Sequence, residues 1–341
     1  MTVRTRLIVL LCALALLAGV ATVSVLRAAD RAERRDRVVP GGPTVTSGRV
    51  ALSGGDGGLL VFRNMAWGPH RDELTTVPAD RPDGERTAGG IKCLRFYAAS
   101  GTGICLQAEH GPVQDTYRAV VLDARLRVTA RYDVPGIPSR ARVSPSGRFA
   151  AWTAFVGGDS YAGSDFSTRT AVVDLRTGRL TPSLEAYRIV RDGRTYRAAD
   201  ANFWGVTFAP DDRTFYATLG TAGHTYLVRG DLQTRTVTTV RTNVECPSLS
   251  PDGTRIVFKK RVKDLPPDAP WHLYTLDLHT LRETPLAEPR SVDDQAVWQD
   301  DTTVTYALPG DYGADLYTIR TDGTGTPHLL TRSAVSPTYL N

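Results

Sequence analysis

The side chains of this sequence that are able to carry out chemistry lack the spacing that catalysis or metal binding requires. The Gly-x-Ser-x-Gly elbow of an α/β-hydrolase is absent, and the nearest candidate, residues 159–161, is typical of a polar loop. Adjacent aspartates at 293–294 and 300–301 are typical of solvated turns. The histidines are scattered, without the spacing of a zinc site, at positions 70, 110, 224, 272, 279 and 328. The sequence therefore predicts a protein that is not an enzyme, with no metal site and no cofactor.

Two of the four cysteines have the spacing for a covalent bond. Cys93 and Cys105 lie at the open ends of one predicted β-hairpin, where a disulfide formed in an oxidising compartment would stabilise the fold by about 2 to 3 kcal/mol. A pair of buried thiols is the alternative, and the sequence leaves both open. Cys246 falls at the start of a different hairpin, so we expect it to be an unpaired core residue.

The segments that must position these residues repeat along the chain. The segment 143–152 (VSPSGRFAAW) is followed by similar segments at 208–217 (FAPDDRTFYA) and 249–258 (LSPDGTRIVF). In each, a turn of the Pro-Asp-Gly type is flanked by β-branched and aromatic residues, which predicts a β-hairpin. Less regular copies, which bring the number to six, lie at 49–62, 93–106 and 298–306.

A second hairpin follows the first in most repeats. These second hairpins are predicted at 171–182, 226–240, 273–286 and 315–331. Two hairpins make a four-stranded sheet, and a ring of such sheets protects strand edges that would otherwise pair with other chains. The sequence therefore predicts an all-β fold, a six-bladed β-propeller of four-stranded blades over residues 49–341. The longest insertion, 187–198, is expected to add an extra hairpin to one blade edge.

One stretch of the repeat resembles a known family. Residues 246–258 (CPSLSPDGTRIVF), followed by the strand 273–278 (LYTLDL), are similar to one complete repeat of a Tol-type propeller. The chain thus resembles TolB-like translocation proteins, most closely over 244–286 and faintly before residue 110. The resemblance implies a six-bladed propeller outside the cytoplasmic membrane that acts through protein contacts. A predicted membrane helix stands where periplasmic TolB has an α/β domain, so only fold, location and style of binding are carried over.

The N-terminal segment predicts attachment to a membrane. Residues 7–26 form an uncharged run that is long enough, as a helix, to cross a hydrocarbon core of roughly 30 Å. Residues 1–27 are therefore interpreted as a transmembrane anchor, with a cleaved signal sequence as the alternative, since 19–21 fits a small-x-small cleavage site. Residues 28–48, rich in charge and then in Pro, Gly, Ser and Thr, are interpreted as a charged and flexible linker.

The charges near this segment bear on location and partners. Five arginines follow the apolar run and two precede it, which favours a cytoplasmic C-terminal side, but large domains translocate largely regardless of flanking charge. We expect a single-pass protein of the cytoplasmic membrane with its propeller outside the cytoplasm, or a secreted protein if the segment is cleaved. Most of the net charge of +5 belongs to the N-terminal arginines, so the propeller is nearly neutral and no nucleic-acid binding is predicted.

One mouth of the predicted channel carries the candidate binding residues. Alignment of the repeats places 202–204 on 243–245, and both segments come just before the inner strand of a blade. The segment 202–204 also follows the longest insertion, and insertions in propellers collect on functional faces. The basic stretch 259–263 is typical of a solvated loop. Structural packing of the insertion is the alternative to a binding role. The hypothetical partner-binding surface consists of Asp200, Asn202, Phe203, Trp204 and Glu245.

The predicted function is therefore binding rather than catalysis. The leading hypothesis is a membrane-anchored, extracytoplasmic, non-enzymatic propeller that serves as a protein-interaction scaffold, with protein partners in the cell envelope. The alternative is a sensor or accessory propeller that binds a small ligand or a sugar.

Overall fold

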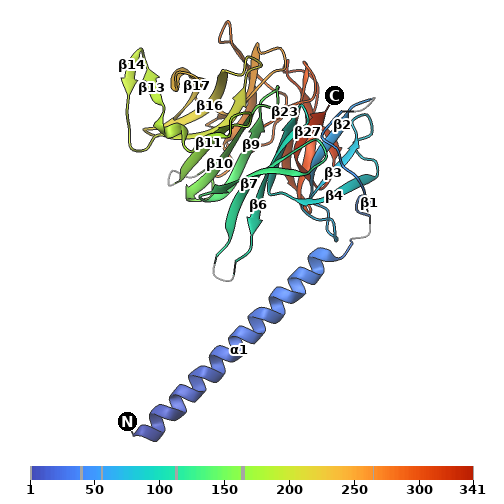
Figure 1. Cartoon of the computed structure of the whole chain (residues 1–341), viewed down its shortest axis with the longest axis vertical. Helices are drawn as coiled ribbons and strands as arrows, with labels where there is room; N and C mark the ends of the chain where they lie inside the picture. Colours follow the sequence, from blue (N-terminus) through green and yellow to red (C-terminus); the bar gives the residue numbers. More distant parts are fainter. Residues whose placement is uncertain are drawn as a thin grey trace.

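The strands of the computed structural model form six separate sheets, arranged as the blades of a propeller (Figure 1). The structure describes residues 2–38, 41–54, 57–111, 114–162, 166–263 and 265–340. In the four plain blades, consecutive strands are antiparallel neighbours, as the register of Val143 opposite Ala150 illustrates. The predicted all-β, six-bladed fold is confirmed.

Four blades have the plain four-stranded form. Blade 2 consists of β5 (Arg95–Ala99), β6 (Thr102–Glu109), β7 (Thr116–Leu122) and β8 (Val128–Val134). Blade 3 consists of β9 (Ile137–Val143), β10 (Phe149–Gly157), β11 (Ser167–Asp174) and β12 (Arg179–Thr181). Blade 5 consists of β19 (Glu245–Leu249), β20 (Arg255–Arg261), β21 (Trp271–Asp277) and β22 (Glu283–Pro285). Blade 6 consists of β23 (Val297–Trp298), β24 (Thr303–Gly310), β25 (Gly313–Arg320) and β26 (His328–Thr331).

Blade 1 is built from both ends of the chain and closes the ring. It contains β2 (Leu59–Asn64), β3 (Glu73–Pro78), β4 (Arg86–Lys92), the C-terminal β27 (Ala334–Leu340) and the short β1 (Val45–Ser47). β27 lies antiparallel to β2, with Leu340 opposite Leu59, and β1 lies parallel to β4. The hairpin expected at 49–62 is therefore wrong: 49–54 form no strand, and 55–56 in its turn lie outside the described residues. Because β27 forms one edge of this sheet, a single blade joins the two ends of the chain and closes the ring, which a local hairpin would not achieve.

Blade 4 carries the insertion. Its four regular strands are β15 (Asn202–Phe208), β16 (Thr214–Thr221), β17 (His224–Asp231) and β18 (Thr236–Thr242). The extra hairpin of β13 (Arg188–Arg191) and β14 (Arg194–Tyr196) follows the single turn η1 (Leu184–Ala186). β13 pairs in parallel with β18, so the hairpin extends the outer edge of the sheet, as expected for this segment.

Apolar side chains between neighbouring blades hold the ring together. Between blades 3 and 4, Phe149 and Val172 belong to one buried cluster with Phe215 and Leu219. Full burial of a side chain of this size contributes about 1.5 to 3 kcal/mol, so each interface between blades adds several such contributions. Because each sheet is covered on both faces by its neighbours, the strands have long buried runs, such as all but the first residue of β15.

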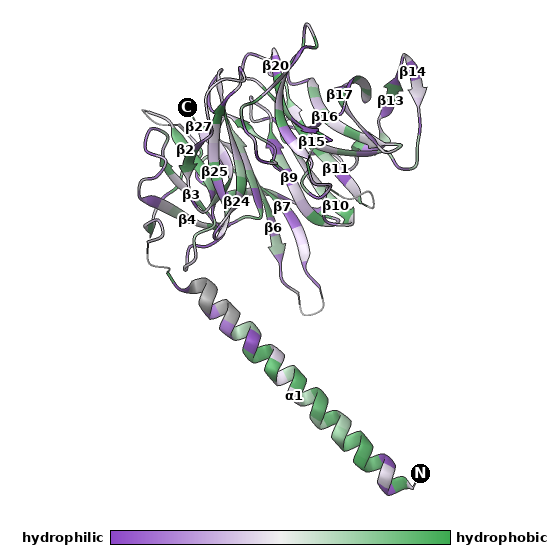
Figure 2. Cartoon of the chain, turned by 180° about the vertical axis from the view of Figure 1, so that it is seen from behind, coloured by the Kyte–Doolittle hydropathy of each residue, from purple (hydrophilic) through white to green (hydrophobic). Residues whose placement is uncertain are grey.

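The N-terminal helix α1 (Val3–Asp36) stands away from the propeller (Figure 1). Among the described residues it is the one helix long and apolar enough to cross a membrane, over Val3–Asp30, and a signal sequence has the same properties. Its apolar residues occupy a long central stretch, with hydrophilic residues at the N-terminal end and again towards the propeller (Figure 2). The helix continues through 28–36, the first part of the expected linker, because this stretch is rich in alanine, arginine and glutamate, which favour helix.

Candidate functional site

A pocket of about 540 Å³ lies beside the first residues of β15. We call it the Trp204 pocket. Blade 4 supplies most of its wall, from the starts of β15 and β17 and the ends of β16 and β18. Blade 5 contributes Arg261 at the end of β20, and the segment between β10 and β11 of blade 3 contributes Ala162 and Phe166. The pocket therefore depends on the relative placement of three blades.

Three of the five residues selected from the sequence line this pocket. They are Asp200, Asn202 and Trp204. Phe203 does not, because successive side chains of a strand point to opposite faces, and its fully buried ring packs in the cluster between blades 3 and 4. Glu245 is also fully buried and acts indirectly, through an ion pair with Arg261. Phe203 and Glu245 are thus not part of the pocket lining.

Trp204 forms an aromatic floor. Its ring stacks on Tyr161, with 5.3 Å between centroids, and meets Phe166 edge-on at 5.4 Å. Trp204 is 1% exposed, and its indole N–H has no hydrogen-bond acceptor among the described residues. A Cβ atom at Gly220 would lie 2.7 Å from the indole ring, so only glycine allows β16 to approach so closely. The floor is therefore a rigid aromatic surface.

Asp200 and Asn202 form a polar rim. Asp200 accepts hydrogen bonds from the Ala222 amide at 2.6 Å and the Thr221 hydroxyl at 2.8 Å, and these bonds hold the pKa of Asp200 below its ordinary value. Asn202 accepts a bond from the Thr168 amide at 2.9 Å and donates to the Asp200 carbonyl. The rim thus presents an ionised carboxylate in a fixed place.

Arg261 supplies the opposite charge. Its Nε lies 2.8 Å from Glu245 Oε1, and its guanidinium also donates to the Tyr161 carbonyl. Asn243 exchanges hydrogen bonds of 3.0 Å with the Arg261 main chain in both directions. Sequence reasoning missed Arg261 because it assigned 259–263 to a solvated loop. The signal available was that Arg261 lies at an even spacing from Val257 and Lys259 in the strand predicted at this place, since alternate residues of a strand share a face.

Lys259, on β20, belongs to a cluster of charges beside the pocket. Lys259 is fully buried, forms an ion pair with Asp293, and has its ammonium 3.9 Å from the Trp271 ring centroid. Arg140 lies 3.4 Å from the same carboxylate and over the Tyr161 ring. Burial alone would raise the pKa of Asp293, but Lys259 and Arg140 hold it below its ordinary value. This cluster fixes the position of Tyr161, which supports Trp204.

The pocket lining carries groups of both charges. Asp200 contributes a carboxylate and Arg261 a guanidinium, and both are able to form charged hydrogen bonds with a bound molecule. His224, also in the lining, lies near the Tyr226 ring, with 6.4 Å between ring centroids.

Cys93 and Cys105, away from the pocket in blade 2, are joined by a disulfide with their Cα atoms 5.4 Å apart.

Fold and site together define a six-bladed propeller with a pocket at the end of its inner strands. No protein-family model matches the sequence, and no curated protein matches it. Among solved structures, TolB from Acinetobacter baumannii is similar with a TM-score of 0.55 and 17% identity, over 84% of this chain and 67% of TolB. A puromycin-hydrolyzing peptidase from Mycobacterium tuberculosis has a TM-score of 0.49 and 15% identity, and the chain spans 45% of its length. The chain therefore has a TolB-like propeller fold.

Proposed function

We propose that this chain is a membrane-anchored, extracytoplasmic, non-enzymatic propeller that acts as a protein-interaction scaffold in the cell envelope. The observation that carries the proposal is the Trp204 pocket, whose lining combines the Trp204 ring, held in place by Tyr161, with the Asp200 carboxylate and the Arg261 guanidinium. Buried tryptophan and arginine are the side chains that most often dominate protein interfaces. A partner segment with an aromatic or aliphatic side chain between polar groups fits this pocket.

Three further features support the location. α1 is long and apolar enough to anchor the chain in a membrane. The disulfide between Cys93 and Cys105 is of a kind that persists in oxidising compartments and is rare in the cytosol. The TolB-like fold agrees with an extracytoplasmic role.

Photo-crosslinking in native membranes tests the binding role. A crosslinkable residue at His224, on the pocket rim, is expected to capture a partner, whereas one at Thr177, in an exposed turn of blade 3, is not. Thr225→Trp, which fills the pocket, should abolish the capture at 224, whereas Thr238→Trp on the exposed side of β18 should not. Equal capture from 224 and 177, or capture that survives Thr225→Trp, would exclude the pocket as the interaction site.

Cysteine labelling tests the orientation. A membrane-impermeant thiol reagent added to intact cells, or to spheroplasts where an outer membrane blocks access, should label Thr177→Cys in the propeller and leave Thr2→Cys before the helix unlabelled. The reverse pattern would place the propeller in the cytoplasm and refute this part of the proposal.

The size of the pocket favours a second candidate function, the binding of a small ligand or a sugar. Its volume of about 540 Å³ lies within the range of small-molecule sites, and its lining has several polar side chains able to form hydrogen bonds with a ligand or the hydroxyls of a sugar. A small ligand would raise the melting temperature of the purified full-length chain in detergent, through mass action, with no partner protein present. If only a protein partner stabilises the chain, the scaffold function is favoured.

A further inference from the structure

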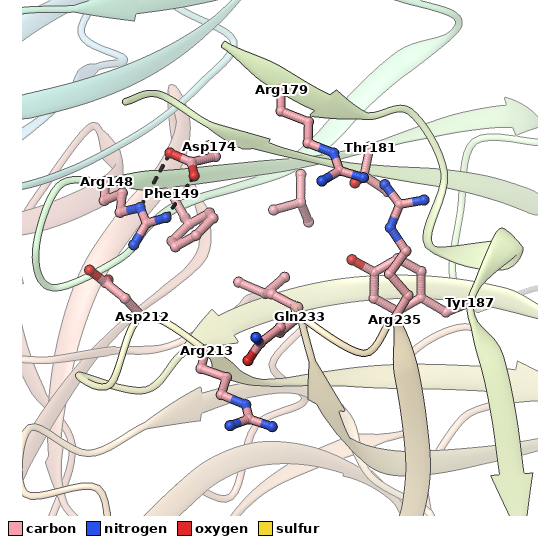
Figure 3. Close-up of a pocket in the computed structure, with 12 residues that line it drawn as sticks. Arg148, Phe149, Asp174, Arg179, Thr181, Tyr187, Asp212, Arg213, Gln233 and Arg235 are labelled. Atoms are coloured by element: carbon pink, nitrogen blue, oxygen red, sulfur yellow. Dashed lines mark hydrogen bonds and ion pairs between the residues drawn. The ribbon is translucent and has the colours of Figure 1, made fainter. Parts of the chain in front are cut away.

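A second pocket, of about 360 Å³, lies between blades 3 and 4 (Figure 3). β15 runs from Asn202, beside the Trp204 pocket, to Phe208, and the turn that follows supplies Asp212 and Arg213 to this second pocket. The two pockets are therefore at opposite ends of the same strands. We call the second one the arginine pocket, because four of its lining residues are arginines, namely Arg148, Arg179, Arg213 and Arg235.

Two of these arginines are neutralised by carboxylates. Arg148 donates two hydrogen bonds to Asp174, the shorter one 2.8 Å long (Figure 3). Arg213 donates two bonds to Asp231, at 2.9 and 2.7 Å. The remaining carboxylate of the lining, Asp212, accepts a bond from the Ser146 hydroxyl at 2.6 Å.

Arg179 and Arg235 have no such partner. Among the described residues, neither guanidinium makes a hydrogen bond or an ion pair. Figure 3 shows both side chains at the same corner of the pocket, next to Thr181 and Tyr187. Burial raises the pKa of Tyr187, while its bond with Thr181 and the charges of Arg235 and Arg179 act in the opposite direction. Both guanidinium groups are thus close enough to act on one phenol.

The insertion holds this corner in place. Tyr187, which follows η1, is 6% exposed and packs edge-on against Phe215 in the core cluster. The Arg188 amide donates a 3.0 Å bond to the carbonyl of Arg235, whose φ of +51° belongs to the tight turn before β18. Arg179 starts β12, opposite Asp174 in the register of the blade. Two like charges are therefore presented side by side from well-anchored main chain, an arrangement that an anion placed between them would stabilise.

We propose that the arginine pocket binds a small organic anion whose oxyanion group is held by Arg179 and Arg235. The planar guanidinium matches carboxylate and phosphoryl oxygens with paired hydrogen bonds, so both groups fit the chemistry. The apolar part of the lining, Phe149, Val172 and Leu232, would contact the body of the ligand. The volume suits a ligand about the size of a monosaccharide. This site is independent of the Trp204 pocket and of the function proposed for it.

Titration calorimetry on the full-length chain in detergent tests this site, with glucose 6-phosphate, glucuronate and neutral glucose as probes. One of the two anions, or both, should bind with a dissociation constant below about 10 mM, and glucose should not. The comparison of the two anions separates phosphoryl from carboxylate recognition. The double substitution Arg179→Gln/Arg235→Gln should weaken binding at least tenfold, whereas Arg194→Gln, an exposed arginine on β14, should leave it unchanged.

A second variant guards against a folding defect in the double substitution. Gln233→Glu, at an exposed position of the lining, places a carboxylate beside the free guanidinium groups and should also weaken anion binding, while Gln233→Lys should not. The proposal is overturned if neither anion binds, if glucose binds as well as the anions, or if anion binding is unaffected by both the double substitution and Gln233→Glu.

Discussion

Removal of the disulfide between Cys93 and Cys105 should weaken the propeller by a measurable and calculable amount. Cys93 lies in the connection from β4 to β5, and Cys105 lies within β6, so the bond fastens the junction of blades 1 and 2 to the second strand of blade 2. The two residues are 12 positions apart. Closing a loop of that length in the unfolded chain corresponds to about 3 kcal/mol of stabilisation. For a domain of this size the loss lowers the melting temperature by roughly 5 °C.

The assay is thermal unfolding of the full-length chain in detergent, with and without reductant, for the wild type and Cys93→Ala/Cys105→Ala. Reductant should lower the melting temperature of the wild type and leave that of the double variant unchanged, although Cys12 and Cys246 are present in both. In parallel, the denatured, unreduced chain should show two thiols and the reduced chain four. A wild type that melts at the same temperature in both conditions, or four thiols before reduction, would refute the reasoning.

Two further predictions follow from other contacts. Gly220→Ala should lower the melting temperature and disturb the Trp204 pocket, because the new Cβ would lie 2.7 Å from the six-membered part of the Trp204 indole. Phenylalanine lacks those indole atoms. In a double-mutant cycle, Gly220→Ala should therefore cost much less stability in the Trp204→Phe background than in the wild type. Bonds from Arg213 and from the Thr234 amide lower the pKa of Asp231 to about 2, so its contribution to stability should be complete above pH 4 and should disappear as the pH falls towards 2. The melting temperature of Asp231→Asn should therefore depend less on pH over this range than that of the wild type, and identical profiles would contradict the assignment.

The hairpins were predictable because their signals are local. In the repeat at 143–152, the Gly147 amide donates to the Ser144 carbonyl at 2.8 Å, and Gly147 has a φ of +77°. Gly253 repeats the same turn with a φ of +71°. A few consecutive residues thus specify each turn, and the alternation beside it specifies the strands. The hairpin expected at 49–62 does not form, because the second neighbour of β2 in the sheet, besides β3, is β27 from the other end of the chain.

The candidate site was predictable only in part. The shared offset of 202–204 and 243–245 correctly indicated one end of the inner strands, and Asp200, Asn202 and Trp204 line a pocket there. The same offset could not show which of Trp204 and Phe203 lines the pocket. The face of the strand that each side chain occupies depends on the register of β15 with β16, and this register has an irregularity after Trp204. Arg261 lies 57 residues beyond Trp204 in sequence and reaches the pocket through the packing of blade 5 on blade 4.

The sequence by itself determined the turns and strands of most of the repeated hairpins, the apolar N-terminal segment and the lack of a recognisable catalytic motif, because each of these is written in neighbouring residues. The tertiary structure alone decided the closure of the ring by β27, the walls of both pockets and which arginines keep a carboxylate partner. Those features join residues that are distant in the chain. Their free energies depend on how six sheets pack around a common axis, which no local pattern encodes.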